Sequence, residues 1–384
     1  MTTGLYVHIP FCRSKCGYCS FASIPWKEAL AERYWRAVVR EMEIAVAGQE
    51  RAPETVDTIF FGGGTPSLLP AGHIAGILDA CRRLFRLDPD CEISLEANPG
   101  TLTNEKAQAY RSCGVNRISL GGQSFADEEL TAIGRVHTVR QIAESMAMLR
   151  SRGPENIGLD LILGLPGQTE HSWFDSLDRT VALAPAHISI YMLELEAESP
   201  LYQSVAAGRQ TLPEEDSVAG WYLQTIDFLD ARGYGQYEIS NFCRSGCECR
   251  HNLKYWLRQP VLGFGAAAHS FDGGSRSANV ADVARYVSAV ENGMSPVAWS
   301  SVVDAEAEMG EMLYLGLRLN RGLDWEAVRR ACRSDRLVDC ESALKEMAGI
   351  GLVEWQGNRV RLTRRGMLLS NEVFQQFVQP WADH

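Results

Sequence analysis

His8-Ile-Pro-Phe-Cys12-Arg-Ser-Lys-Cys16-Gly-Tyr-Cys19 is the stretch of this sequence that decides its fold class. It places three cysteines within eight residues, directly after the short apolar run 5–9. If that run is a parallel strand, the cysteines follow its carboxyl end, where barrel enzymes gather their chemistry. Three thiolates can hold a 4Fe–4S cube and leave one iron open, as a reactive metal site requires. A zinc site with a borrowed fourth ligand, or simply reduced thiols, is the alternative that these residues leave open.

Short apolar runs of the same kind alternate with amphipathic stretches through the first half of the chain. They cover residues 5–9, 56–61, 92–97, 117–120, 157–163 and 187–193. Between the first two runs, apolar residues recur every fourth position, which lines one face of a helix: Leu30, Tyr34, Val38 and Met42. Apolar runs separated by helices indicate parallel strands covered by those helices. Six such units are too few for a closed eight-fold barrel, so we predict an α/β fold with a partial (β/α)6 barrel.

The second half of the chain predicts two further units. Residues 201–300 have a mixed pattern, and we expect an extension packed on the barrel. Beyond them, helices over 302–319 and 324–350, a β-hairpin over 351–363 and a helix over 367–377 resemble a winged-helix module. The predicted domains are therefore the barrel at 1–200, the extension at 201–300 and the winged-helix-like domain at 301–384.

The composition limits the classes of function. With 384 residues, 46% of them hydrophobic and 22% charged, the chain is a folded globular protein. Its net charge of −11 and the balanced charge of the last domain argue against nucleic acid as a partner, and favour a packing or lid role for that domain. No apolar run is long enough to span a bilayer, and the first residues lack the features of an export signal. The 11 cysteines then belong in a reducing compartment, which predicts a cytoplasmic protein.

Glycines and polar residues follow the later apolar runs. Gly62-Gly-Gly64-Thr65-Pro66 comes after the second run, and its backbone can approach a ligand closely because it lacks Cβ atoms. Glu96, Gln123 and Arg135 follow the third and fourth runs, and Asp160 lies within the fifth. Buried carboxylates are costly without partners, so such a group at a barrel mouth predicts a polar ligand. Carboxylates suit the hydroxyl pair of a ribose, and a guanidinium suits a carboxylate.

The cysteine triplet together with the glycine run resembles the radical S-adenosylmethionine (SAM) superfamily, in its HemN-like branch. The resemblance implies a 4Fe–4S cluster held by Cys12, Cys16 and Cys19, with SAM on the open iron. It also implies cleavage of SAM to a 5′-deoxyadenosyl radical by an electron from a donor such as flavodoxin or ferredoxin. The residues that it assigns to SAM are Tyr6, Tyr18, Gly62, Gly63, Thr65, Glu96, Gln123, Arg135 and Asp160, of which Tyr18 matches a position that contacts a second SAM.

Within this branch, Arg250-His251-Asn-Leu-Lys-Tyr255-Trp256 and the later Gly-rich segment ending in His269-Ser270 resemble the HemW-type heme chaperones. That resemblance implies heme bound at His251, with Tyr255 and Trp256 as flat surfaces for the macrocycle. It further implies delivery of heme to acceptor proteins such as respiratory cytochromes, membrane-bound acceptors included. From the residues alone, a histidine beside aromatics is more often a structural residue.

Other functions stay open at this point. Coproporphyrinogen III dehydrogenases carry a further cysteine where this chain has Phe21, and a longer segment than the 11 residues that precede Cys12. A HemN-like methylase or cyclopropanase would share the cluster and the SAM residues, but would give the motif at His251 no role. Whether SAM is turned over at all is also open. Cys243, Cys247 and Cys249 lie close to His251 and are either reduced thiols or ligands of an extra zinc or of heme iron.

Overall fold

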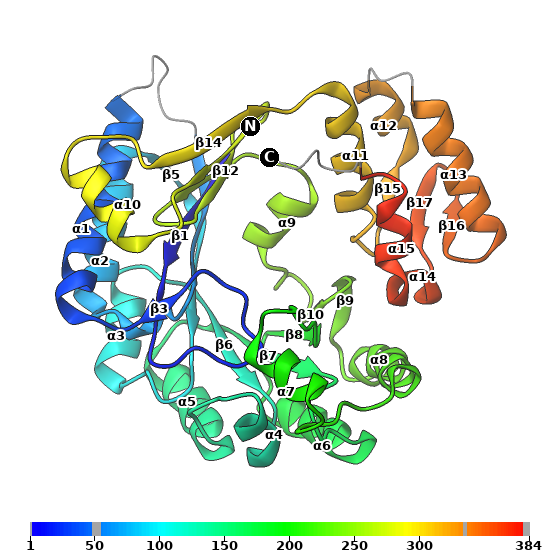
Figure 1. Cartoon of the computed structure of the whole chain (residues 1–384), viewed down its shortest axis with the longest axis horizontal. Helices are drawn as coiled ribbons and strands as arrows, with labels where there is room; N and C mark the ends of the chain where they lie inside the picture. The colour runs from blue at the N-terminus through cyan, green and yellow to red at the C-terminus, as the bar shows by residue number, and fades with distance from the viewer. Residues whose placement is uncertain (1, 48–54, 333–335, 379–384) are drawn as a thin grey trace.

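The computed structural model in Figure 1 describes residues 2–47, 55–332 and 336–378. A parallel core runs through its first half. The strands β1 (Thr3–Ile9), β4 (Thr55–Gly63), β5 (Arg86–Ala97), β6 (Arg117–Gln123), β7 (Asn156–Leu163) and β8 (His187–Met192) pair in chain order, each parallel to the next. The α/β class and the six parallel strands of the partial barrel are therefore confirmed.

Helices connect these strands and pack on their outer side (Figure 1). They are α1 (Glu28–Ala47), η1 (Pro66–Leu68), α2 (Ala71–Leu84), α3 (Asn104–Ser112), α4 (Asp127–Ala132), α5 (Val139–Arg152) and α6 (Glu170–Ala182). In α1, the predicted apolar face is the buried one, since Tyr34, Val38 and Met42 are fully buried and Leu30 is half-buried. Burial of such a face, rather than helix propensity, supplies most of a helix's stability.

Residues 201–300 extend the sheet at both edges instead of only packing on it. On the β1 side lie β11 (Val261–Phe264), parallel to β1, and then the antiparallel strands β12 (His269–Phe271), β13 (Ser275–Asn279) and β14 (Val297–Val302). On the β8 side lie β10 (Asn241–Cys243) and β9 (Gly235–Glu238), both antiparallel. The result is one sheet of twelve strands in the order β14-β13-β12-β11-β1-β4-β5-β6-β7-β8-β10-β9. An unclosed barrel leaves unpaired backbone groups on its two outermost strands, and these added strands satisfy them.

The sheet has an outer face toward the helices and an inner face on the opposite side. Leu5, Val7 and Ile9 are fully buried on the outer face, so Tyr6 and His8, which alternate with them, project inward. The short helix α9 (Arg250–Trp256) lies on this inner side, where the ring of its His251 stacks on Phe60 of β4 at 5.1 Å. The remaining helices of the extension are α7 (Pro200–Ala206), α8 (Glu215–Asp230) and α10 (Val283–Glu291).

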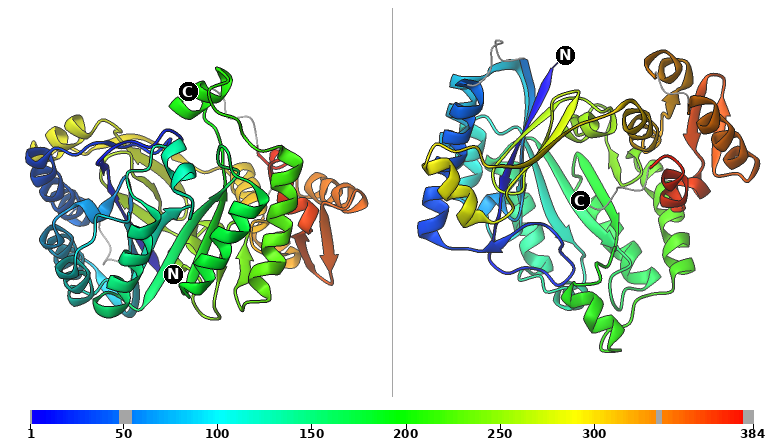
Figure 2. Two further views of the ribbon diagram at one scale, coloured as in Figure 1. Left: turned by 90° about the horizontal axis from the view of Figure 1, so that it is seen from below. Right: turned by 45° about the horizontal axis from the view of Figure 1, so that its top comes forward.

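The last part of the chain forms a smaller unit at one end of the molecule (Figure 2). Its three-stranded sheet has the order β15 (Leu323–Asp324), β17 (Arg359–Leu362) and β16 (Val353–Gln356), so the predicted hairpin is present and β15 was not foreseen. Its helices are α11 (Ala305–Gly316), α12 (Trp325–Ala331), α13 (Leu337–Gly349), α14 (Arg364–Leu368) and α15 (Ser370–Gln375).

Two helix boundaries predicted in this unit were wrong. Residues 302–304 are not helical. Val302 is the last residue of β14 and pairs with Ser275 of β13, and Asp304 caps α11 by accepting from the backbone N–H groups of Glu306 and Ala307. The helix expected over 324–350 is divided, because the backbone of Cys332 is extended and ends α12. Part of that stretch, residues 333–335, lies outside the described residues.

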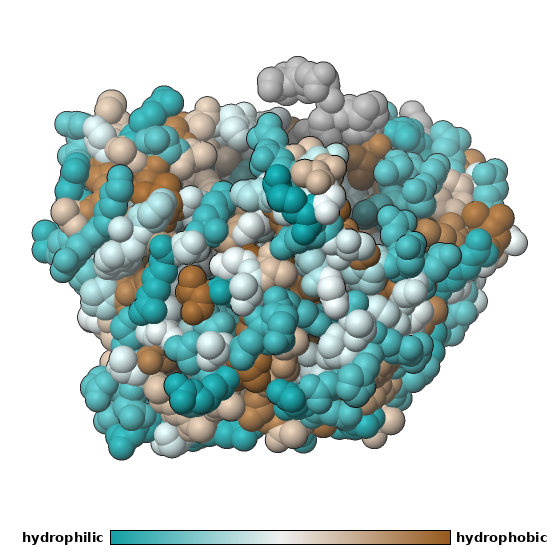
Figure 3. All heavy atoms as spheres, turned by 60° about the horizontal axis from the view of Figure 1, so that its bottom comes forward, coloured by the Kyte–Doolittle hydropathy of each residue, from teal (hydrophilic) through white to brown (hydrophobic). Residues whose placement is uncertain are grey.

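In the part of the chain that the structure describes, no helix is long and apolar enough to cross a membrane. Figure 3 shows polar and apolar side chains interspersed over one face of the molecule.

Candidate functional site

The three cysteines lie on one loop at the carboxyl end of β1, as predicted. The short strands β2 (Phe11–Cys12) and β3 (Ile24–Pro25) pair with each other, so the chain between them closes into a loop (residues 12–25, the cysteine loop). Backbone N–H groups of Ile24 and Trp26 donate to the carbonyls of Pro10 and Cys12 at 2.7 and 2.8 Å, respectively. All three cysteines are free and half-buried, so their sulfurs are available as ligands.

The side chain of His8 ties this loop to the sheet. Its Nε2 donates to the carbonyl of Ala22 at 2.8 Å, so Nδ1 accepts from the hydroxyl of Tyr6 at 3.1 Å. Burial lowers the pKa of His8, which keeps the ring neutral. The backbone carbonyl of the same residue accepts from the hydroxyl of Tyr34 of α1 at 2.8 Å. The sequence analysis did not select His8, although its inward position just before the cysteines is a signal that could have found it.

The glycine run packs directly against the cysteine loop. A Cβ on Gly64 would lie 2.8 Å from the carbonyl oxygen of Phe11 and 3.0 Å from Cys12 Sγ, so only glycine lets the two segments approach this closely. Gly63 has a positive φ of 113°, and its N–H donates to Glu96 Oε2 at 3.1 Å. Thr65 Oγ1 donates to Cys12 Sγ at 3.6 Å. The run therefore links the first cysteine to the polar residues of β5.

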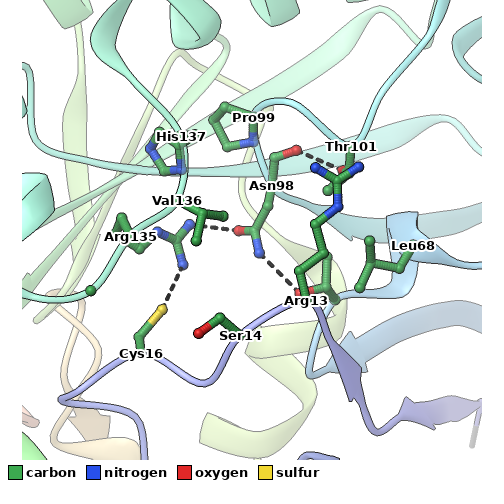
Figure 4. A pocket seen from close by; sticks show the side chains of 12 residues that line it. Arg13, Ser14, Cys16, Leu68, Asn98, Pro99, Thr101, Arg135, Val136 and His137 are labelled. Carbon is green, nitrogen blue, oxygen red and sulfur yellow. Dashed lines mark hydrogen bonds between the residues drawn. The ribbon is translucent and has the colours of Figure 1, made fainter. Parts of the chain in front are cut away.

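Arg135 reaches the same place from the segment after α4 (Figure 4). Its Nη1 donates to Cys16 Sγ at 3.6 Å, and its Nη2 donates to Asn98 Oδ1 at 2.6 Å and to the carbonyl of Gly121 at 2.7 Å. A small pocket opens beside it, lined among others by Arg13, Cys16, Thr65, Asn98, Arg135 and His137. Asn98 also donates to Thr65 Oγ1 at 3.0 Å, so it fixes the arginine and the threonine together.

Gln123 and Tyr18 lie near Arg135, Gln123 beside Gly121 and Tyr18 against Ile133. Gln123 has a positive φ of 69°, which is uncommon for a residue with a Cβ atom. A Cβ on Gly121 would be 2.9 Å from Gln123 Nε2 and 3.0 Å from Arg135 Nη2, so this glycine makes room for both. Tyr18 packs on a small apolar cluster with Ile133 and Ile162, and burial raises its pKa.

The two carboxylates predicted for the site are linked through Ser119, which pairs with Glu96 in the neighbouring strand and donates to Asp160. Asp160 accepts from the hydroxyl of Ser119 at 2.9 Å and from that of Ser189 at 2.6 Å. Burial raises the pKa of Glu96 to about 8, with the charge of Asp160 as the second cause. Burial also raises the pKa of Asp160. The sequence analysis did not select Ser119 or Ser189, although they lie on β6 and β8, the two strands that flank β7.

Replacing Glu96 with glutamine is expected to stabilise the protein at high pH. The folded-state pKa is raised above that of the unfolded chain, so wild-type stability falls as the pH rises from about 5 through 8. The variant lacks this loss, and at pH 9 it should be more stable by about 2 kcal/mol, less than the full shift implies because the side chain is half-buried. Urea unfolding of the SAM-free protein at pH 5, 7 and 9 measures the difference. The exposed Glu144→Gln is the control, and parallel curves for wild type and Glu96→Gln would contradict the expectation.

The donor set of the cysteine loop consists of three free thiols, which fits an iron–sulfur cluster because cysteine thiolates are the usual ligands of its irons. Within residues 2–47, 55–332 and 336–378, no group of three Cys, His, Asp or Glu side chains has the arrangement of ligands of one metal ion. The same finding gives no single-ion site at Cys243, Cys247, Cys249 and His251. There, Cys249 is buried and its Sγ donates to Glu92 Oε1 at 3.6 Å.

The three residues predicted for heme lie on α9 but do not share one environment. His251 is 1% exposed, and its Nδ1 and Nε2 are hydrogen-bonded with Thr58 Oγ1 at 2.9 Å and with the hydroxyl of Tyr255 at 3.1 Å. Burial lowers the pKa of His251 to about 3, so its ring is neutral. Tyr255 is 38% exposed. Trp256 points elsewhere, with the guanidinium of Arg318 over its ring at 4.4 Å from the ring centre.

Comparison with known proteins agrees with this geometry. Residues 6–180 match the model of the radical SAM superfamily, and residues 303–369 match that of the HemN C-terminal domain. The chain is 38% identical over 378 residues to the heme chaperone HemW of Bacillus subtilis, which covers 97% of this chain and 98% of that protein. It is 36% identical to the heme chaperone HemW of Mycobacterium tuberculosis, over 96% of this chain and 93% of that one.

Among solved structures, the coproporphyrinogen III oxidase HemN of Escherichia coli superposes with a TM-score of 0.84. The match covers 98% of this chain and 90% of that enzyme at 24% identity, which shows a common fold. The two HemW relatives have higher sequence identities, 38% and 36%, over 97% and 96% of this chain. The chain therefore belongs to the radical SAM superfamily and, within it, to the HemW family.

Proposed function

We propose that this protein is a heme chaperone that carries one 4Fe–4S cluster and SAM beside its heme. Membership of the radical SAM superfamily implies the cluster and SAM. Cys12, Cys16 and Cys19 are the three cluster ligands in this proposal, and the fourth iron is left for SAM. The hydrogen bonds from Thr65 to Cys12 and from Arg135 to Cys16 support it, because donors to sulfur favour the thiolate form that binds iron.

The polar residues around the cysteine loop would bind and orient SAM. Arg135 would hold its carboxylate, and Glu96 and Asp160 would accept from the ribose hydroxyls. The raised pKa values of the two carboxyl groups reflect their burial, and further hydrogen-bond donors such as the hydroxyl groups of a ligand would stabilise their charged forms. In this proposal, Gly62, Gly63, Thr65, Gln123, Tyr18 and Tyr6 would complete the contacts to SAM. The cluster, when bound, can supply an electron for the reductive cleavage of SAM.

The observation that carries the heme proposal is the open inner face of the sheet. Tyr191 and Tyr255 belong to this face, yet they are 44% and 38% exposed. Tyr191 is two residues along β8 from Ser189, which donates to Asp160, and the hydroxyl of Tyr255 is hydrogen-bonded with His251, whose ring lies 6.4 Å from that of Tyr6, so both tyrosines are on the side of the sheet that carries the proposed SAM residues. Flat aromatic surface that water reaches, with a polar group at its edge, suits a porphyrin. Heme would lie on this face near α9, with the His251–Tyr255 pair beneath it.

In the cell, the protein would receive heme in the cytoplasm and pass it to acceptor proteins such as respiratory cytochromes. A flavodoxin or ferredoxin would be its electron donor if SAM is cleaved. In this proposal, the barrel at 1–200 carries the cluster and SAM, the extension at 201–300 contributes to the heme site, and the unit at 301–384 packs beside them.

The test is hemin uptake and transfer by the full chain after anaerobic reconstitution of the cluster. We expect a Soret band that saturates at one hemin per chain, and its replacement by the spectrum of the acceptor when an apo-cytochrome of b type is added. A chain that takes up no hemin, or that takes it up without releasing it to the acceptor, contradicts the proposal. Protoporphyrinogen formed from coproporphyrinogen III with SAM and a reductant would instead identify a dehydrogenase.

A further inference from the structure

The second histidine of the heme-chaperone motifs, His269, lies in a different setting from His251. It begins β12 and is exposed, whereas His251 is buried. The ring of His269 meets Trp299 of β14 edge to face, with the ring centres 6.0 Å apart. In the part of the chain that the structure describes, no side-chain hydrogen bond engages the ring nitrogens of His269, whereas both of those of His251 are engaged. An iron ligand needs a free ring nitrogen, and His269 offers one.

The strand register places His269 and Trp299 in one row. His269 pairs with Ala278 of β13, and Ala278 pairs with Trp299 of β14. Directly paired residues of neighbouring antiparallel strands project to the same face of a sheet. Trp299 is 43% exposed, so the row presents a histidine and a large aromatic surface together to solvent.

That face is the inner one. Phe271, two residues along β12 and hence on the same face as His269, contacts the guanidinium groups of Arg258 and Arg276, each 4.6 Å from its ring centre. Arg258 is two residues past the end of α9, the helix that lies on the inner side. The register agrees, because Phe271 pairs with Val261 of β11, and Val261 and Gly263 pair with Gly4 and Tyr6 on the inner face of β1.

The spacing between this row and the tyrosines suits a porphyrin. Val261 of β11 pairs with Phe271, and Gly263 of the same strand pairs with Tyr6 of β1. His269 is thus two strand spacings from Tyr6, about 10 Å along the sheet, which is comparable to the width of the macrocycle. Tyr6 in turn lies 6.4 Å from the ring of His251, whose partner is the exposed Tyr255. A heme on the inner face can therefore reach from His269 toward Tyr255.

We propose that His269, rather than His251, is the protein ligand of the heme iron, and that Trp299 contacts the porphyrin beside it. The buried His251 then acts as a positioning residue that holds the hydroxyl of Tyr255. This inference rests on the proposed heme chaperone function and adds to it the ligand atom and the wall of the site. Partial desolvation of the His269 ring and the charge of Arg276 lower its pKa, so the imidazole is neutral and its lone pair is free for iron at neutral pH.

The experiment titrates the anaerobically reconstituted full chain with hemin and compares four variants by absorption and electron paramagnetic resonance. His269→Ala is expected to weaken binding by about 10- to 100-fold and to remove the spectral signature of histidine ligation. Added imidazole should restore that signature in His269→Ala. Trp299→Ala should weaken binding while the histidine signature stays. His251→Ala should keep the signature, and His171→Ala is the matched control because His171 is exposed on the outer helix α6.

The outcomes separate the ligand assignment from the function. If wild type takes up no hemin, the proposed function itself fails. If wild type binds hemin and His269→Ala gives the same affinity and spectrum, the assignment of His269 is overturned and the function stands. Loss of the histidine signature in His251→Ala but not in His269→Ala would also overturn it.

Discussion

Replacing Cys12, Cys16 and Cys19 together with alanine is expected to lower the bound iron from about four atoms per chain to none. Each substitution removes one thiolate ligand, and nearby side chains do not replace it. Thr65 and Arg135 approach the sulfurs as hydrogen-bond donors and cannot bind iron themselves. Iron and sulfide analysis after anaerobic reconstitution measures the loss, together with the visible absorption from sulfur-to-iron charge transfer.

The fold should survive this triple substitution. All three cysteines are half-buried and lie on a loop, so their removal should change the free energy of unfolding little. Cys113→Ser is the matched control, because Cys113 is also free and half-buried but donates to the carbonyl of Tyr110 at 3.2 Å, away from the cysteine loop. It should retain full iron. Iron that persists in the triple variant, or zinc found in place of iron in the wild type, would refute the cluster assignment.

Gly63→Ala is expected to destabilise the protein by about 2 to 4 kcal/mol. Two costs add at this position. Its φ of 113° is one that residues with a Cβ rarely adopt. The new Cβ would also lie 2.6 Å from Cε1 of His8, and that ring cannot swing away without losing its hydrogen bonds to Ala22 and Tyr6.

The same substitution should weaken SAM binding by at least about tenfold, because a shift of 1.4 kcal/mol in the site already has that effect. The N–H of Gly63 donates to Glu96, one of the two carboxylates proposed to accept from the ribose hydroxyls. A displaced backbone at Gly63 would therefore also displace the Glu96 side chain. Urea unfolding and calorimetric SAM titration measure the two effects. Gly72→Ala is the control: it lies in α2, a Cβ there meets nothing within 4 Å, and alanine should stabilise the helix slightly. Equal stability of Gly63→Ala and wild type would show that the loop relaxes freely.

The parallel core and the cysteine loop could be predicted from the sequence because their signals are local. The apolar runs of β1 and β4 to β8, and the four-residue repeat of α1, are periodicities within a single element. The cysteines and the glycine run each come directly after a strand, and parallel strands end at one edge. Those two facts bring residues 12–19 and 62–65 together. The boundaries at 302–304 and 332 failed because a strand partner and a local backbone change, rather than periodicity, end those helices.

The tertiary structure alone decided which polar groups become partners. Ser119 and Ser189 hold Asp160 because the register of β6, β7 and β8 aligns them, and register depends on pairing between distant segments. Likewise, the sequence by itself placed His251 and His269 in family motifs, but it did not show which of the two has a ring nitrogen available to bind iron. Folding buries His251 between Thr58 and Tyr255, and leaves His269 exposed beside Trp299, because α9 lies on the inner face and β12 extends its edge. A residue's neighbours across the sheet, unlike its neighbours along the chain, are set by how the strands pair.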